Sequence, residues 1–164
     1  MPPNVTTYIS VIGGSSCSAA VAVLGEQLGE LLAEHGCVVV NGGMSGVMEA
    51  VARGVRRGGG TCVGVLPGLD RRGAAPDLAL SLLTGLGHAR NLAVVASGDA
   101  VIALGGSWGT LSEIGLARSI GRQVVLLESW SVTPHEGEPD GLHRAGSPRE
   151  AVDLAIALAQ AARA

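Results

Sequence analysis

The sequence predicts a single α/β domain of the Rossmann-like kind, in which helices cover both faces of a doubly wound parallel sheet. Two observations predict this fold. Apolar runs typical of buried strands alternate with amphipathic stretches of helical period along the 164 residues. The composition is 47% hydrophobic but includes no Phe, one Tyr and two Trp, so the core must be aliphatic, as in strands buried on both faces. We expect one domain over residues 1–164.

The first elements alternate as this fold requires. Residues 8–12 are expected to form a strand that runs into a pair of glycines. Residues 19–35 have leucines and valines at helical spacing, and Gly36 is placed to end that helix. A second strand over 37–40 and a second helix over 47–57 repeat the unit.

The middle of the chain is less regular. Residues 61–66 form a third apolar strand, which Pro67 stops because proline cannot continue a sheet ladder. Residues 69–77 are polar and are expected to form a loop, either a mobile flap or a plain connector. A short fourth strand is expected at 80–84 and a short helix at 88–97.

The last part returns to the strand–helix pattern. A fifth strand over 100–104 leads through glycines into a helix over 108–120, and a sixth strand follows at 123–127. Residues 131–146 read as a second polar loop. Ser147-Pro148 then begins the final helix, because serine is a common N-cap and proline suits the first helical position.

Glycine-rich turns follow four of the expected strands, and parallel strands place such turns along one edge of the sheet. Open α/β sheets bind ligands at this carboxyl edge, where the strand order reverses, here expected between the first and fourth strands. Glycine lets backbone N–H groups approach an anion closely, although such turns also serve as plain connections. The candidate ligand- and phosphate-binding residues are Gly13, Gly14, Ser15, Gly42, Gly43, Met44, Gly105, Gly106, Ser107, Gly109 and Thr110.

The charged residues restrict the chemistry. All eleven basic residues are Arg, which excludes Schiff-base, pyridoxal-phosphate and P-loop enzymes because each needs a lysine. A phosphate must then be held by backbone amides, hydroxyls or guanidinium groups. The net charge of −3 argues against a nucleic-acid partner. No His or Cys spacing is typical of a metal site, and with neither signal peptide nor membrane-length apolar run we expect a cytoplasmic protein.

The segment that includes Thr110 and Glu113 carries the most specific functional signal in the sequence. Glu113 lies one helical turn beyond Thr110, so both are expected at the same mouth of the sheet. The alternative is a capping box with Thr110 as N-cap and Glu113 as its partner, which needs no ligand. Arg90 is expected beside the same crevice, where it binds phosphate, pairs with a carboxylate, or is simply a surface residue. Trp108 is placed to stack on a base or to pack at a subunit contact.

Residues 105–113 resemble the PGGxGTxxE motif of the LONELY GUY (LOG)-like phosphoribohydrolases, and residues 41–48 resemble their second glycine motif. The resemblance implies cleavage of a nucleoside 5′-monophosphate to free base and ribose 5-phosphate, with no cofactor required for catalysis. It assigns catalysis to Arg90 and Glu113, phosphate binding to Gly105, Gly106, Gly109 and Thr110, and it implies a homodimer with sites near the interface.

Residues 84–91 and 97–99 are similar to a short branch of the same superfamily that includes molybdenum-cofactor carrier proteins. This similarity implies a second hypothesis, in which the protein carries molybdenum cofactor or a similar pterin- or nucleotide-like anion without turnover. Asn91 after Arg90, where the enzymes have Lys, favours the carrier branch. A single-stranded DNA binder is the third hypothesis, and the acidic balance and scarce aromatic residues argue against it.

Overall fold

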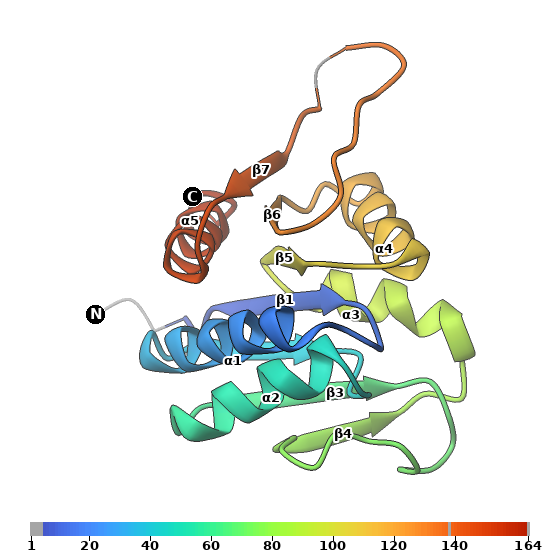
Figure 1. Cartoon of the computed structure of the whole chain (residues 1–164). Coiled ribbons are helices and arrows are strands. Elements are labelled where there is room, and N and C mark those ends of the chain that lie inside the picture. Colours follow the sequence, from blue (N-terminus) through green and yellow to red (C-terminus); the bar gives the residue numbers. More distant parts are fainter. Residues whose placement is uncertain (1–4, 138, 164) are drawn as a thin grey trace.

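The computed structural model describes residues 5–137 and 139–163. In this part of the chain, seven parallel strands form one sheet in the order β4-β3-β2-β1-β5-β6-β7, with helices on both faces (Figure 1). The strands are β1 (Tyr8–Gly13), β2 (Val38–Asn41), β3 (Thr61–Leu66), β4 (Leu80–Leu83), β5 (Ala100–Leu104), β6 (Val124–Leu127) and β7 (Leu142–Ala145). The expected Rossmann-like α/β fold is therefore confirmed.

The helices follow the expected order. They are α1 (Ala19–Glu34), α2 (Val47–Arg57), α3 (Asn91–Ser97), α4 (Trp108–Ser119) and α5 (Pro148–Ala161), with a 3₁₀ turn, η1 (Gly87–Arg90), before α3. Ser147 caps α5 as expected, because its side chain accepts a hydrogen bond from the backbone N–H of Glu150. The region predicted as one helix over 88–97 is thus a 3₁₀ turn followed by a short α-helix.

Two expectations about the sheet are wrong. The strand order reverses between β1 and β5, not between the first and fourth strands, because β2, β3 and β4 extend the sheet outward before the chain returns to the other side of β1. The predicted loop over 131–146 also includes β7, which pairs with β6 from Val124↔Leu142 to Leu127↔Ala145. Within the described part of that segment, residues 131–137 project from the body of the protein (Figure 1).

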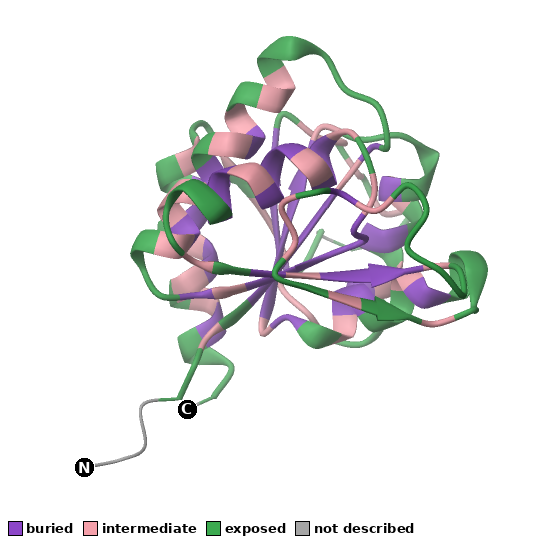
Figure 2. Ribbon diagram, turned by 90° about the horizontal axis from the view of Figure 1, so that it is seen from below, coloured by how far each residue is buried: buried purple, intermediate pink, exposed green. Residues whose placement is uncertain are grey.

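The core has two layers, one on each face of the sheet. Helices α1, α2 and α5 pack on one face against residues such as Ile9, Val39 and Ile102. Helices α3 and α4 pack on the other face and against each other, around Val94, Val101 and related residues. Figure 2 shows burial concentrated in the central strands and in the helix faces turned towards them. All residues of β5 are buried, so the loop after it has a rigid base.

Cys37 and Cys62 are buried within the core, and Cys17 is exposed. Burial raises the pKa of Cys62 to about 12. No helix in residues 5–137 and 139–163 combines the length and apolar character needed to cross a membrane. Within the same residues, no three His, Cys, Asp or Glu side chains are grouped so as to hold a metal ion.

Candidate ligand-binding site

The loops after β1, β2 and β5 meet at the carboxyl edge of the sheet. Strands β1 and β5 are neighbours, with Gly13 opposite Leu104 at their ends. The loops after β1 and β2 are joined by two hydrogen bonds, from the backbone N–H of Val47 to the carbonyl of Gly14 (3.0 Å) and from the Ser45 hydroxyl to the carbonyl of Ser15 (2.8 Å). The turns after β1 and β2 are thus joined, and the turn after β5 begins beside the end of β1.

Asn41 fixes the conformation of the β2 loop. It is fully buried, its Oδ1 accepts a hydrogen bond from the backbone N–H of Gly43 at 2.8 Å, and its Nδ2 donates to the carbonyl of Met48 at 3.0 Å. A buried amide with both ends satisfied holds the intervening backbone in one shape. Asn41 begins the glycine motif over residues 41–48, and an Asn that ends an apolar strand just before two glycines is a usable sequence signal for this role.

Arg90, at the end of η1, lies against the β2 loop. A Cβ atom on Gly42 would lie 2.5 Å from Nη1 and 2.7 Å from Nη2 of Arg90, so only glycine leaves room for this guanidinium. Only 8% of Arg90 is exposed, and its Nε has no hydrogen-bond partner in the described part of the chain. Burying an unpaired polar group is costly, so a retained one calls for a physical explanation such as a ligand.

The β5 loop leads directly into α4. Gly106 has φ +126°, a conformation that side-chain-bearing residues rarely adopt, and it brings the backbone onto Thr110. Ser107 is the N-cap of α4 and forms a reciprocal capping box with Thr110, in which the Ser107 N–H donates to Thr110 Oγ1 at 3.3 Å. The alternative with Thr110 as N-cap and Glu113 as partner is therefore wrong. The first-turn amides of Trp108 and Gly109 have no acceptor within the helix and remain able to bind an anion.

Glu113 lies on the same buried face of α4 as Thr110, and only 7% of it is exposed. Burial raises the pKa of Glu113 to about 7, against an opposing effect of the Arg90 cation, which lowers it. Burial also lowers the pKa of Arg90, and the carboxylate of Glu113 opposes that shift. The two side chains therefore influence each other's charge without a salt bridge within 4.0 Å among the described contacts.

This pair is unusual in the molecule. Among residues 5–137 and 139–163, Arg90 and Glu113 are the two charged residues that are buried. Both lie at the carboxyl edge of the sheet. Buried titratable groups with shifted pKa values are typical of functional sites. The arrangement presents a cation for an anionic ligand and a carboxyl group that titrates near neutrality, next to free backbone amides.

The candidate residues differ in what surrounds them. The β5 turn residues Gly106, Ser107 and Gly109 are exposed, whereas Thr110 is buried and occupied in the capping box. Met44 lies against Gly73, in the segment predicted as a loop over 69–77, which is a loop as expected. That segment is attached to the β2 loop, since the N–H of Ala75 donates to the carbonyl of Gly43 at 2.8 Å.

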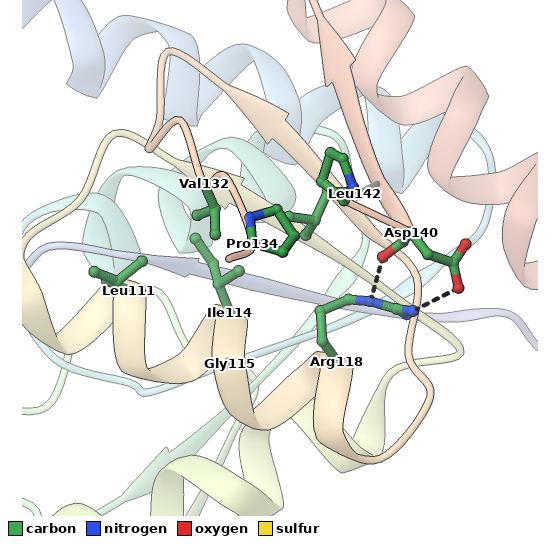
Figure 3. Close-up of a pocket in the computed structure, with 9 residues that line it drawn as sticks. Leu111, Ile114, Gly115, Arg118, Val132, Pro134, Asp140 and Leu142 are labelled. Atoms are coloured by element: carbon green, nitrogen blue, oxygen red, sulfur yellow. Dashed lines mark hydrogen bonds and ion pairs between the residues drawn. The ribbon is translucent and has the colours of Figure 1, made fainter. Parts of the chain in front are cut away.

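Two pockets adjoin α4. A pocket of about 300 Å³ lies beside the glycine turn and is lined by Gly105, Gly106, Glu128, Ser129 and Trp130. A second, of about 560 Å³, lies between the outer face of α4 and the β6–β7 segment, with Ile114, Val132, Pro134 and Leu142 among its lining residues (Figure 3). There, Arg118 Nε donates to the Asp140 carbonyl at 2.9 Å. The second pocket does not include the candidate site residues.

The fold is shared with proteins of known structure. The molybdenum cofactor binding protein of Rippkaea orientalis superposes with a TM-score of 0.87 at 31% sequence identity, covering 94% of this chain and 98% of that one. The molybdenum cofactor carrier protein of Chlamydomonas reinhardtii gives a TM-score of 0.77 at 28% identity, over 93% and 98% of the two chains.

A sequence relative carries the name of an enzyme. A protein of Oryza sativa subsp. japonica, named "Probable cytokinin riboside 5′-monophosphate phosphoribohydrolase", is 40% identical over 111 residues, which is 65% of this chain. The match spans 45% of the length of that relative. The profile of the SLOG cluster4 family matches residues 6–152, nearly the whole chain. The chain therefore belongs to the SLOG cluster4 family.

Proposed function

We propose that the protein binds a phosphorylated, nucleotide-like ligand at the carboxyl edge of the sheet and hydrolyses its N-glycosidic bond. The observation that carries the proposal is the pair of buried charges, Arg90 and Glu113, beside the glycine turn that begins α4. The phosphate is held by the amides of this turn and by the partial positive charge of the helix N-terminus. The coarse proposal, ligand binding, also agrees with the names of the similar proteins.

The reaction follows from the carboxyl group. Water adds to C1′ of the ribose, the bond between C1′ and the base nitrogen breaks, and the products are the free base and ribose 5-phosphate. In its ionised form Glu113 stabilises positive charge that develops on the sugar, and it accepts a proton from the attacking water. That proton ends on the leaving base nitrogen, so the base leaves in its neutral form and Glu113 is ionised again. A pKa of about 7 leaves a useful fraction of Glu113 ionised at neutral pH. Arg90 orients the anionic ligand and keeps Glu113 from protonating more completely.

Carriage of molybdenum cofactor without turnover is the second candidate. It is favoured by two solved structures, one of a molybdenum cofactor binding protein and one of a molybdenum cofactor carrier protein. Each matches this chain over nearly the full length of both chains compared. The same glycine turn and Arg90 hold the phosphate of the cargo in this case, and Glu113 has no proton to transfer.

One experiment tests both candidates. The purified protein is incubated with AMP and GMP at concentrations that saturate binding, and free base is measured by chromatography. Hydrolysis predicts base release that Glu113→Gln lowers by about 10²-fold or more while binding persists, because a neutral amide cannot take the proton. Binding without base release contradicts the hydrolase and leaves the carrier, which predicts that molybdopterin copurifies or binds when supplied. Absence of binding by nucleotide and cofactor alike contradicts the whole proposal.

A further inference from the structure

Both tryptophans of the chain lie beside the glycine turn. They are two of its three aromatic residues, and their ring centroids are 5.1 Å apart with the planes inclined by 41°. Trp108 is 77% exposed, so it gains little from burial in the protein core. An indole that lines a pocket, as Trp130 does here, is typical of surfaces that stack on a flat ring. Trp130 is partly buried and packs against the core layer that includes Ile114, so it also contributes to folding, whereas the position of Trp108 suggests a role in binding.

Hydrogen bonds hold this aromatic surface in place relative to the turn. The indole N–H of Trp130 donates to the carbonyl of Ser107 at 3.1 Å, and the Ser129 hydroxyl donates to the carbonyl of Gly105 at 2.6 Å. Two hydrogen bonds therefore join Ser129 and Trp130, just after β6, to the turn that is proposed to hold the phosphate. The pocket of about 300 Å³ beside it is shallow and open to solvent, so it suits a flat ring that lies against its wall rather than an enclosed ligand.

Glu128 lines the same pocket and has a strained backbone. Among residues 5–137 and 139–163, Glu128 is the one non-glycine residue whose backbone φ angle is positive, at +47°. Such a conformation costs about 1 kcal/mol or more for a residue with a side chain, and it persists mainly at functional sites. The residue is exposed, and an ionised carboxylate has hydrogen-bond acceptors only. Its natural partner is a ring edge with two adjacent N–H donors.

We propose that this pocket is the subsite for a 2-amino-4-oxopyrimidine ring fused to a second ring, the edge that guanine and pterin share. The ring stacks on the indole of Trp130, which lines the pocket, while the Glu128 carboxylate accepts hydrogen bonds from the ring N–H and the exocyclic amino group. Adenine lacks this pair of donors, because a ring acceptor stands next to its amino group. The inference rests on the proposed function, since the phosphate of the ligand occupies the neighbouring turn.

Calorimetric titration separates ring recognition from phosphate recognition. The probes are ribose 5-phosphate, AMP, GMP and neopterin monophosphate. We expect GMP or the pterin to bind at least about tenfold more tightly than AMP, which is the discrimination that one bidentate pair supplies. Tighter GMP binding identifies a guanine ligand, tighter pterin binding identifies a pterin, and equal affinities support the shared edge.

The variants make the assignment falsifiable. Glu128→Gln is expected to bring the affinities of GMP and AMP within about threefold of each other, because an amide matches both edges. Glu136→Gln removes the same charge from an exposed site in the β6–β7 segment and is the matched control, expected to keep the wild-type ratio. Trp130→Ala, measured with the same ligands, is expected to weaken GMP binding by a larger factor than ribose 5-phosphate binding, because it removes the stacking surface as well as the bond to the Ser107 carbonyl.

The titrations distinguish a failure of the ring assignment from a failure of the proposed function. If AMP binds as tightly as GMP and the pterin, or if Glu128→Gln leaves their ratio unchanged, the ring assignment is overturned, while ribose 5-phosphate binding still supports the proposed function. If none of the four phosphorylated probes binds, the proposed function fails and the subsite with it.

Discussion

Arg90 lies so close to the backbone of Gly42 that a Cβ atom on Gly42 would be 2.5 Å from its Nη1 atom. This contact joins the 3₁₀ turn before α3 to the loop after β2. The β2 loop is in turn held by the buried amide of Asn41. Arg90 is therefore positioned by a backbone surface rather than by a salt bridge, and its charge stays available to a ligand.

Gly42→Ala tests this positioning. The added methyl group displaces the guanidinium, since the Met48 sulfur at 2.6 Å also crowds the same space. We expect at least a tenfold loss of affinity for GMP in calorimetry. Gly115→Ala is the control, because a Cβ there meets nothing within 4 Å and alanine favours a helix, so stability should rise by up to about 1 kcal/mol with affinity unchanged. Wild-type affinity in Gly42→Ala would show that Arg90 does not contact the ligand.

Arg90→Met separates binding from folding. A charge-assisted hydrogen bond contributes about 1.5–3 kcal/mol, so affinity for GMP should fall roughly ten- to a hundredfold. The stability of the unliganded protein should hold or increase, because methionine places an apolar chain where a buried guanidinium lacks a partner for Nε. Urea unfolding and calorimetry on the same preparation measure the two effects. A large loss of stability with unchanged affinity would mean that Arg90 is a structural residue.

Glu113 makes stability depend on pH. Its pKa is raised in the folded protein to about 7 from 4.5, so the folded state binds the proton more tightly than the unfolded state. The stabilisation is fully present below about pH 4.5 and is lost as pH rises through 7, with a total of about 3 kcal/mol. Urea midpoints of the wild type should fall relative to those of Glu113→Gln between pH 5 and 8. Parallel curves for the two proteins would contradict the raised pKa.

Glu128→Gly is expected to stabilise the protein and impair recognition of the ring. Glycine adopts φ +47° without steric cost, so the free energy of unfolding should increase by up to about 1 kcal/mol. The preference for GMP over AMP should disappear as in Glu128→Gln. Thermal unfolding with and without GMP measures both. A destabilised Glu128→Gly variant would argue that the side chain has a structural contact instead.

Most of the fold was predictable because aliphatic strands and glycine turns have strong local patterns. The strand β7 was missed, since its residues Leu142 to Ala145 are half-exposed and mixed in character, and their pairing with β6 is what defines them. The position of the reversal in strand order was also wrong. Nothing in the local sequence says on which side of β1 the returning strand β5 will pair.

The candidate site was predictable in its parts but not in its contacts. The sequence placed the glycine turns at one edge, yet the capping partner of Thr110 proved to be Ser107, three residues earlier. The support from Asn41 and the neighbourhood of Trp130 and Glu128 depend on contacts between separate loops. Such contacts have no periodicity in the sequence, so they emerge only from the folded chain.

A crystal structure of the protein with bound GMP is the most direct test of the central claim. We expect the phosphate at the amides of the turn that includes Gly106 and Gly109, with Arg90 and Glu113 facing the ribose. The guanine ring is expected against Trp130. A nucleotide seated instead in the pocket between α4 and the β6–β7 segment, away from Arg90, would contradict it.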